Sequence, residues 1–253
     1  MQPLITICAR KGSKGVPGKN TRDFNGRPLI EWTIETAIEW GAGPIVISSD
    51  DEKVEEIFDD YMYCDIYFDE RPEHLARDDT PKLEVLRSVV HKTQAVLGDF
   101  DYIVDLDPTN PCRTVEDLEN CRRLFEEKKP KTLISVTKAK KNPYMNQIQY
   151  TSFAKKPNNK YGIVIDIFVD EYVNYLDSYA PTKNIRRQDA PVVYDVNSNI
   201  YFYDIEWLCG EDQSNIPITN KTEIYIMPDH AFCDIDNIVD FEVSGFLHRK
   251  YYE

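Results

Sequence analysis

The feature that most constrains this fold is a regular alternation of short apolar runs with amphipathic segments. Runs rich in β-forming residues cover 4–9, 44–48, 102–106 and 132–136. Apolar residues recur at helical spacing in a segment that begins at residue 28, and further helices are predicted over 51–59, 83–97 and 115–127. Such alternation predicts an α/β fold with a Rossmann-like, mostly parallel sheet and helices on both faces. We also expect a long strand over 192–203 and a final helix over 238–251.

The alternation breaks between about residues 138 and 188. Turn-forming residues such as Asn158-Asn159 and Pro181 separate short alternating stretches there, which predicts an inserted β-rich flap. Residues 1–137 and 189–253 would then form one nucleotide-binding catalytic domain. Aromatic side chains in the flap indicate either a partner surface or a small satellite core; they are Tyr144, Tyr161, Phe168, Tyr172 and Tyr175.

The charge balance narrows the function classes. The chain of 253 residues has a formal net charge of -14, which disfavours nucleic acid as a partner because a nucleic-acid reader needs a basic face. An anionic substrate would require a local basic pocket within this acidic whole. The sequence has no apolar run near ~20 residues and no signal peptide, so we expect no membrane partner and a cytoplasmic protein.

A cationic, glycine-containing loop directly follows the first predicted strand. Residues 9–20 read Ala-Arg-Lys-Gly-Ser-Lys-Gly-Val-Pro-Gly-Lys-Asn. Glycines allow backbone N–H groups to approach a polyphosphate, and Arg and Lys supply its counter-charge. The alternative is a flexible, solvated basic loop, but the carboxyl end of a parallel strand is where ligands bind in such sheets. The stretch matches neither the Walker pattern nor GxGxxG.

Residues 9–20 closely resemble the signature loop of the acylneuraminate cytidylyltransferases, commonly written A-R-x-G-S-K-G-x-P-x-K-N. The resemblance continues in Asn-Gly-Arg-Pro-Leu-Ile at 25–30, Ser-Ser-Asp at 48–50, Pro-Thr-Asn-Pro-Cys-Arg at 108–113 and Arg-Arg-Gln at 186–188. It implies an enzyme that transfers CMP from CTP to a sialic-acid-like sugar. It also implies a set of CTP-binding residues: Arg10, Ser13, Lys14, Lys19, Asn20 and Thr109. Asp107 departs from the pattern, because the family usually has glutamine there.

A pair of carboxylates near the C-terminus provides a candidate metal site. Asp234-Ile235-Asp236 could direct two carboxylates at one cation, and Mg²⁺ prefers oxygen ligands. Taken alone, the pair also fits a surface turn in which Asp236 caps the last helix. The resemblance favours the metal, because the family places an Asp-x-Asp metal site just before that helix. We therefore expect Asp234 and Asp236 to bind Mg²⁺.

The acceptor site rests on the resemblance alone. It implies that Arg187, Gln188, Asn197 and Tyr201 bind the sugar, and Ser198 stands where the family has glycine. It also implies a homodimer formed through the flap, since relatives dimerise in this way.

The implied reaction is attack by the anomeric hydroxyl of the acid sugar on the α-phosphorus of CTP. Pyrophosphate leaves in line, and catalysis consists mainly of positioning and charge neutralisation. We expect Arg10, Lys19, Asp234 and Asp236 to be catalytic, and no dedicated general base is apparent. The alternatives are a CMP-Kdo synthetase, transfer of another nucleotide, and a nucleotide-binding paralogue without turnover.

Overall fold

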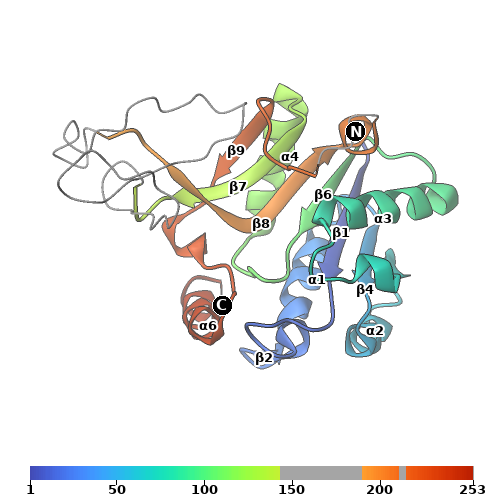
Figure 1. Cartoon of the computed structure of the whole chain (residues 1–253), viewed down its shortest axis with the longest axis horizontal. Helices are drawn as coiled ribbons and strands as arrows, with labels where there is room; N and C mark the ends of the chain where they lie inside the picture. The colour runs from blue at the N-terminus through green and yellow to red at the C-terminus, as the bar shows by residue number, and fades with distance from the viewer. Residues whose placement is uncertain (143–189, 211–214, 253) are drawn as a thin grey trace, which may run out of the picture. The chain divides into compact units, whose positions relative to one another are not determined.

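The fold is described by a computed structural model of residues 1–142, 190–210 and 215–252. Its centre is a seven-stranded sheet with the order β5-β4-β1-β6-β8-β7-β9 (Figure 1). The strands are β1 (Pro3–Ala9), β4 (Ile45–Ser49), β5 (Ile66–Glu70), β6 (Tyr102–Leu106), β7 (Thr132–Lys138), β8 (Tyr194–Asp204) and β9 (Thr222–Ile226). β1 pairs in parallel with β4 and β6, and β8 runs antiparallel to β6. The predicted mostly parallel sheet is confirmed.

Helices cover both faces of this sheet, as the sequence predicts. They are α1 (Leu29–Trp40), α2 (Glu52–Asp59), α3 (Lys82–Leu97), α4 (Val115–Lys128), α5 (Ile205–Cys209) and α6 (Ile238–Tyr251). Ile5 and Ile7 of β1 pack in one core cluster with residues of α1, α2 and α4. Leu4 belongs to the opposite cluster, together with residues of α3 and α5. One strand feeds both cores because successive side chains of a strand point to opposite faces.

Several elements were not predicted from the sequence. β5, β9 and α5 are additional, as are the short pair β2 (Asp23–Phe24) and β3 (Arg27–Pro28) and the 3₁₀ turns η1 (Lys19–Thr21), η2 (Glu73–Leu75) and η4 (Asp229–Phe232). In β5 only Ile66 is buried, so this edge strand lacks the apolar run that reveals the central strands. The predicted strand over 192–203 is β8, and its pairing with β6 places it inside the sheet.

The chain forms two compact units. One consists of Met1–Thr137 with Val196–Glu253, and the other is Lys138–Asp195. In the second unit, the Ala139 N–H donates to the carbonyl of Val193 (3.1 Å). The aromatic residues of the predicted flap fall within residues 143–189, which lie outside the described residues. The dimerisation role of the flap therefore stays a prediction.

The parallel strands bring three loops to one edge of the sheet. β1, β4 and β6 run in the same direction, so the segments that follow Ala9, Ser49 and Leu106 all begin at their carboxyl ends. This edge is where open α/β sheets bind ligands. None of the helices in the described part of the chain is long and apolar enough to cross a bilayer.

Candidate active site

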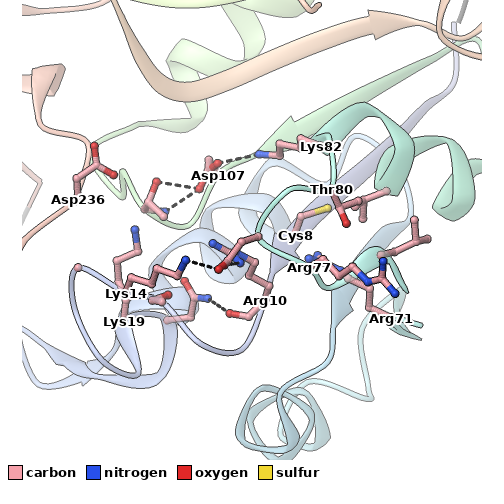
Figure 2. Close-up of a pocket in the computed structure, with 17 residues that line it drawn as sticks. Cys8, Arg10, Lys14, Lys19, Arg71, Arg77, Thr80, Lys82, Asp107 and Asp236 are labelled. Carbon is pink, nitrogen blue, oxygen red and sulfur yellow. Dashed lines mark hydrogen bonds and ion pairs between the residues drawn. The ribbon is translucent and has the colours of Figure 1, made fainter. Parts of the chain in front are cut away.

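A cavity of about 400 Å³ lies at this edge, which is within the usual size range for small-molecule sites (Figure 2). Its walls come from the loop after β1, the connection between β5 and α3, the loop after β6 and the turn before α6. Among the residues predicted from the sequence, those that line it are Arg10, Ser13, Lys14, Lys19, Asn20, Thr109 and Asp236. The folded chain thus brings together residues more than two hundred positions apart.

Positive charge dominates the cavity wall. The cationic side chains are Arg10, Lys14, Lys19, Arg71, Arg77 and Lys82, and the carboxylates are Asp78, Asp107 and Asp236. Cations therefore outnumber carboxylates here, although the whole chain has a net charge of -14. A local basic pocket in an acidic protein suits a polyanionic ligand.

The cationic loop touches the carboxylate pair through its backbone. A Cβ built on Gly15 would lie 1.7 Å from the carbonyl oxygen of Asp236, so a side chain cannot fit there without displacing one of the two segments. The Lys19 ammonium donates to the carbonyl of Ile235. Glycine at position 15 is therefore required by close approach of two backbones.

The Asp234-Ile235-Asp236 segment is anchored by its middle residue. Ile235 is fully buried in a small core with Val16 and Leu29, and its N–H donates to the carbonyl of Thr109 (3.0 Å). The N-cap of α6 is Asn237, which forms a capping box with Asp240. The alternative in which Asp236 caps this helix is therefore wrong, and its carboxylate lines the cavity instead.

Asp234 lies beside the cavity in a partly buried position. Burial raises the pKa of Asp234, and hydrogen bonds from the hydroxyls of Thr109 and Ser198 act in the opposite direction. The Thr109 hydroxyl contacts both Asp234 (2.7 Å) and Asp107 (2.9 Å). Because a hydroxyl has one proton, it can donate to only one of these carboxylates at a time.

Asn20 offers a polar atom that is suited to a ligand. Its side-chain N–H donates to the carbonyl of Arg10 (3.3 Å). Its Oδ1 atom is buried and receives no hydrogen bond from any described residue. A buried acceptor without a donor is costly, so a ligand N–H or O–H group in the cavity would stabilise it.

Sequence reasoning missed four charged residues of the wall: Arg71, Arg77, Asp78 and Lys82. Arg71 directly follows β5 and donates to the carbonyl of Ser48 (2.7 Å). Asp78 forms ion pairs with Arg10 and Lys14. One signal was available for Lys82, since a lysine at the first position of α3 opposes the helix dipole and suggests a specific partner.

The predicted sugar-binding residues are not gathered at this cavity by the described structure. Arg187 and Gln188 lie outside the described residues. Asn197 is buried, where it accepts from the Ser135 hydroxyl (2.7 Å) and donates to the carbonyl of Ala231 (2.9 Å). Tyr201 lies on β8, with its ring centroid 5.5 Å from the Lys82 nitrogen. Their contact with a sugar stays a prediction.

Comparison with known proteins now identifies the family. Residues 4–225 match the family described as cytidylyltransferase. This chain belongs to the cytidylyltransferase family. The match ends before Asp234 and Asp236, so it does not bear on the carboxylate pair. Membership makes this protein a nucleotidyltransferase.

Relatives of this cytidylyltransferase match it over nearly its whole length. The flagellin modification protein B of Campylobacter coli is 30% identical over 98% of this chain and 95% of the relative. The CMP-N,N'-diacetyllegionaminic acid synthase of Campylobacter jejuni is 30% identical over 96% and 94%. A pseudaminic acid cytidylyltransferase of the same species is 26% identical over 100% and 99%.

The fold of the cytidylyltransferase is also found among solved structures. A CMP:2-keto-3-deoxy-manno-octonic acid synthetase in complex with CTP aligns with a TM-score of 0.64 and 16% identity, over 99% of both chains. A 4-diphosphocytidyl-2C-methyl-D-erythritol synthase from Anaerococcus prevotii aligns with a TM-score of 0.58 and 13% identity, over 98% of both chains. At these identities the likeness supports the fold alone.

Proposed function

We propose that this cytidylyltransferase transfers CMP from CTP to the anomeric hydroxyl of a nonulosonic acid, a nine-carbon sugar acid. Two relatives support this acceptor class, since one is named for N,N'-diacetyllegionaminic acid and the other for pseudaminic acid. The observation that carries the proposal is the meeting of the cationic loop with Asp236 around one cavity. A loop that only extended into solvent would not require Gly15 to touch a distant carboxylate segment.

The chain's own residues would bind and orient the reacting groups. The acceptor oxygen forms a bond to the α-phosphorus of CTP, the bond to the β-phosphate oxygen breaks, and the acceptor loses its hydroxyl proton to solvent. Arg10, Lys14 and Lys19 would neutralise the charge that develops on the departing pyrophosphate. Asn20 would accept a hydrogen bond from the nucleoside through its buried Oδ1.

The carboxylate pair fits a divalent cation such as Mg²⁺. Asp234 and Asp236 offer oxygen ligands, and both belong to a segment fixed by Ile235. No group of three His, Cys, Asp or Glu side chains in the described ranges could hold a metal alone, so phosphate or water oxygens would complete the coordination. When bound, the cation neutralises charge on phosphate oxygens.

The proposal is tested by pyrophosphate release. The purified protein is assayed with each of the four NTPs and with a panel of sialic, legionaminic, pseudaminic and Kdo acceptors. We expect turnover with CTP and at least one nine-carbon acid. Preference for Kdo would favour the CMP-Kdo synthetase alternative, and no release with any pair would favour a paralogue without turnover. A cytoplasmic homodimer stays our expectation, and gel filtration tests the dimer.

A further inference from the structure

A lysine bridges two carboxylates at the inner end of the cavity. The Lys82 nitrogen lies 2.7 Å from an oxygen of Asp105 and 2.7 Å from an oxygen of Asp107. Figure 2 shows the pair with Asp107. Lys82 and Asp107 line the cavity, whereas Asp105 is fully buried behind them. The lysine therefore joins a residue of the core to a residue of the site.

The fold explains why these three side chains meet. Asp105 lies on β6 and Asp107 follows it by two residues, so both side chains face the side of the sheet that α3 covers. Ile103, on the same face of β6, packs in the core cluster that contains α3 residues. Lys82 begins α3 at this point. Asp105 also accepts from the Thr6 hydroxyl (3.0 Å), which fixes the far end of the group.

The ammonium of Lys82 is the shared counter-charge of the two carboxylates. Burial alone lowers the pKa of Lys82, but Asp105 and Asp107 outweigh it and raise this pKa well above the usual value. Burial raises the pKa of Asp107, yet Lys82 and hydrogen bonds from Thr109 outweigh it and lower this pKa. Removing Lys82 would leave two carboxylates, one of them fully buried, without a counter-charge, whereas removing Asp107 leaves Lys82 paired with Asp105.

Asp107 keeps unused hydrogen-bonding capacity toward the cavity. Its Oδ1 atom accepts from the Thr109 N–H (3.1 Å) and lies 2.9 Å from the Thr109 hydroxyl, whose one proton it shares with Asp234, and its Oδ2 atom accepts from Lys82 (2.7 Å). A carboxylate oxygen can accept two hydrogen bonds, so Oδ2 can take one more. The side chain is 19% exposed, and that exposed part belongs to the cavity wall.

We propose that Lys82 is a positioning residue that holds Asp107 so that its carboxylate accepts a hydrogen bond from the acceptor sugar. The inference rests on the proposed function and adds a specificity determinant to it. Glutamine, which the family usually has at this position, can donate as well as accept, whereas a carboxylate only accepts. The favoured acceptors would therefore present a hydroxyl or amide N–H to Asp107, and a carboxylate or ether oxygen at that point would be rejected.

A double-mutant cycle tests the pairing. The wild-type enzyme, Lys82→Gln, Asp107→Asn and the double variant are compared by kcat and KM for CTP and for the acid sugar. Lys131→Gln is the matched control, because Lys131 pairs with Asp204 at 3.0 Å, has the same 34% side-chain exposure as Lys82 and does not line the cavity. Lys82→Arg tests whether positive charge suffices.

We expect a loss in kcat/KM for the sugar of about 100-fold for Lys82→Gln and about 10-fold for Asp107→Asn, with the double variant near 100-fold rather than about 1000-fold. KM for the sugar should rise more than KM for CTP, a split that a purely structural role would not produce. Lys82→Arg should recover most of the activity, and Lys131→Gln should match the wild type.

The contrary outcomes are distinct. The pairing would be overturned, and the proposed function left standing, by either of two results with an active wild-type enzyme. One is a loss in the double variant equal to the product of the two single losses, and the other is an equal rise of KM for the sugar and KM for CTP in the variants. Wild-type protein without any transfer to a sugar acid would overturn both. Melting temperatures of all variants are measured, and if Lys82→Gln unfolds at the assay temperature, Asp107→Asn and Lys82→Arg decide the test. An unchanged KM for the sugar in Asp107→Asn would then contradict the inference.

Discussion

The cavity has two walls that use charge in opposite ways. The inner wall consists of Arg71, Lys82 and Asp107. The loop wall consists of Asp236 and the lining residues of the cationic loop, which are Arg10, Ser13, Lys14, Gly15, Lys19 and Asn20. In the loop wall, the Lys14 side chain is 77% exposed and its ion-pair partner Asp78 is 48% exposed. In the inner wall, Lys82 pairs with the fully buried Asp105. One wall has charges that can change partners, and the other has charges that are fixed.

From this difference we infer separate roles for the two walls. An exposed ion pair contributes little net stability, so a triphosphate can replace Asp78 as the partner of Arg10 and Lys14 at little cost. Asp105 is fully buried and depends on the partly exposed Lys82 for its counter-charge, so we expect the inner wall to keep its shape while substrates bind. The loop wall is suited to transient phosphate charge, and the inner wall to recognition.

The largest effect is expected from Asp236→Ala, which removes the carboxylate of the loop wall. Without this carboxylate the transition state would be less stable by several kcal/mol. We therefore expect kcat to fall at least about 1000-fold while the protein stays folded. The measurement is Mg²⁺-dependent pyrophosphate release, with circular dichroism as the folding check. Glu242→Gln, an exposed carboxylate change on α6, is the control. Activity within a few-fold of the wild type would remove the metal assignment.

Gly15→Ala tests whether the loop wall depends on backbone contact. The new Cβ would lie 1.7 Å from the carbonyl oxygen of Asp236, so the loop must move away and kcat/KM should fall about 100-fold. Gly12→Ala is the comparison: Gly12 has φ +82, which strains any side chain, but nothing lies within 4 Å of its Cβ position. Equal losses in the two variants would mean that strain rather than contact matters.

Arg10→Ala separates the phosphate role of the loop wall from recognition of the sugar. Loss of a charge-assisted contact should reduce kcat/KM for CTP about 30-fold and change KM for the acid sugar far less. Lys11→Ala is a matched control, because Lys11 pairs with Glu52 and does not line the cavity. A larger effect on the sugar than on CTP would show that the two subsites are exchanged.

The smallest effect concerns Ser198, which stands where the resembled family has glycine. Ser198 has φ 50, the left-handed region that favours glycine. In thermal unfolding, Ser198→Gly should be at least as stable as the wild type. The free energy of unfolding of Ser198→Val should be about 1–2 kcal/mol lower, because a β-branched residue strains this backbone. Equal stability of the valine and glycine variants would contradict the backbone argument.

Most residues of the loop wall could be grouped from the sequence because they are contiguous. Arg10, Lys14 and Lys19 occupy one loop after one apolar strand, so position and chemistry could be inferred together. The inner wall could not be predicted in this way. Lys82 and Asp107 come from separate elements and meet only because α3 covers the face that Asp105 and Asp107 share.

Residue type also failed to predict side-chain surroundings on β8. Asn197 matches a motif implied to bind sugar, yet its amide is buried and bonded to Ser135 and Ala231. An amide that bonds to core groups has the same sequence signature as one that faces a ligand. Edge strand β5 escaped prediction for a related reason, since a half-exposed strand lacks a continuous apolar run.

The most direct test of the shared triphosphate site is a crystal structure with CTP and Mn²⁺, with the metal located by its anomalous signal. We expect a peak bonded to Asp234 or Asp236 and to phosphate oxygens, with Arg10 and Lys19 contacting the same triphosphate. A triphosphate bound away from the cationic loop, or a metal away from both carboxylates, would contradict the proposed catalytic arrangement.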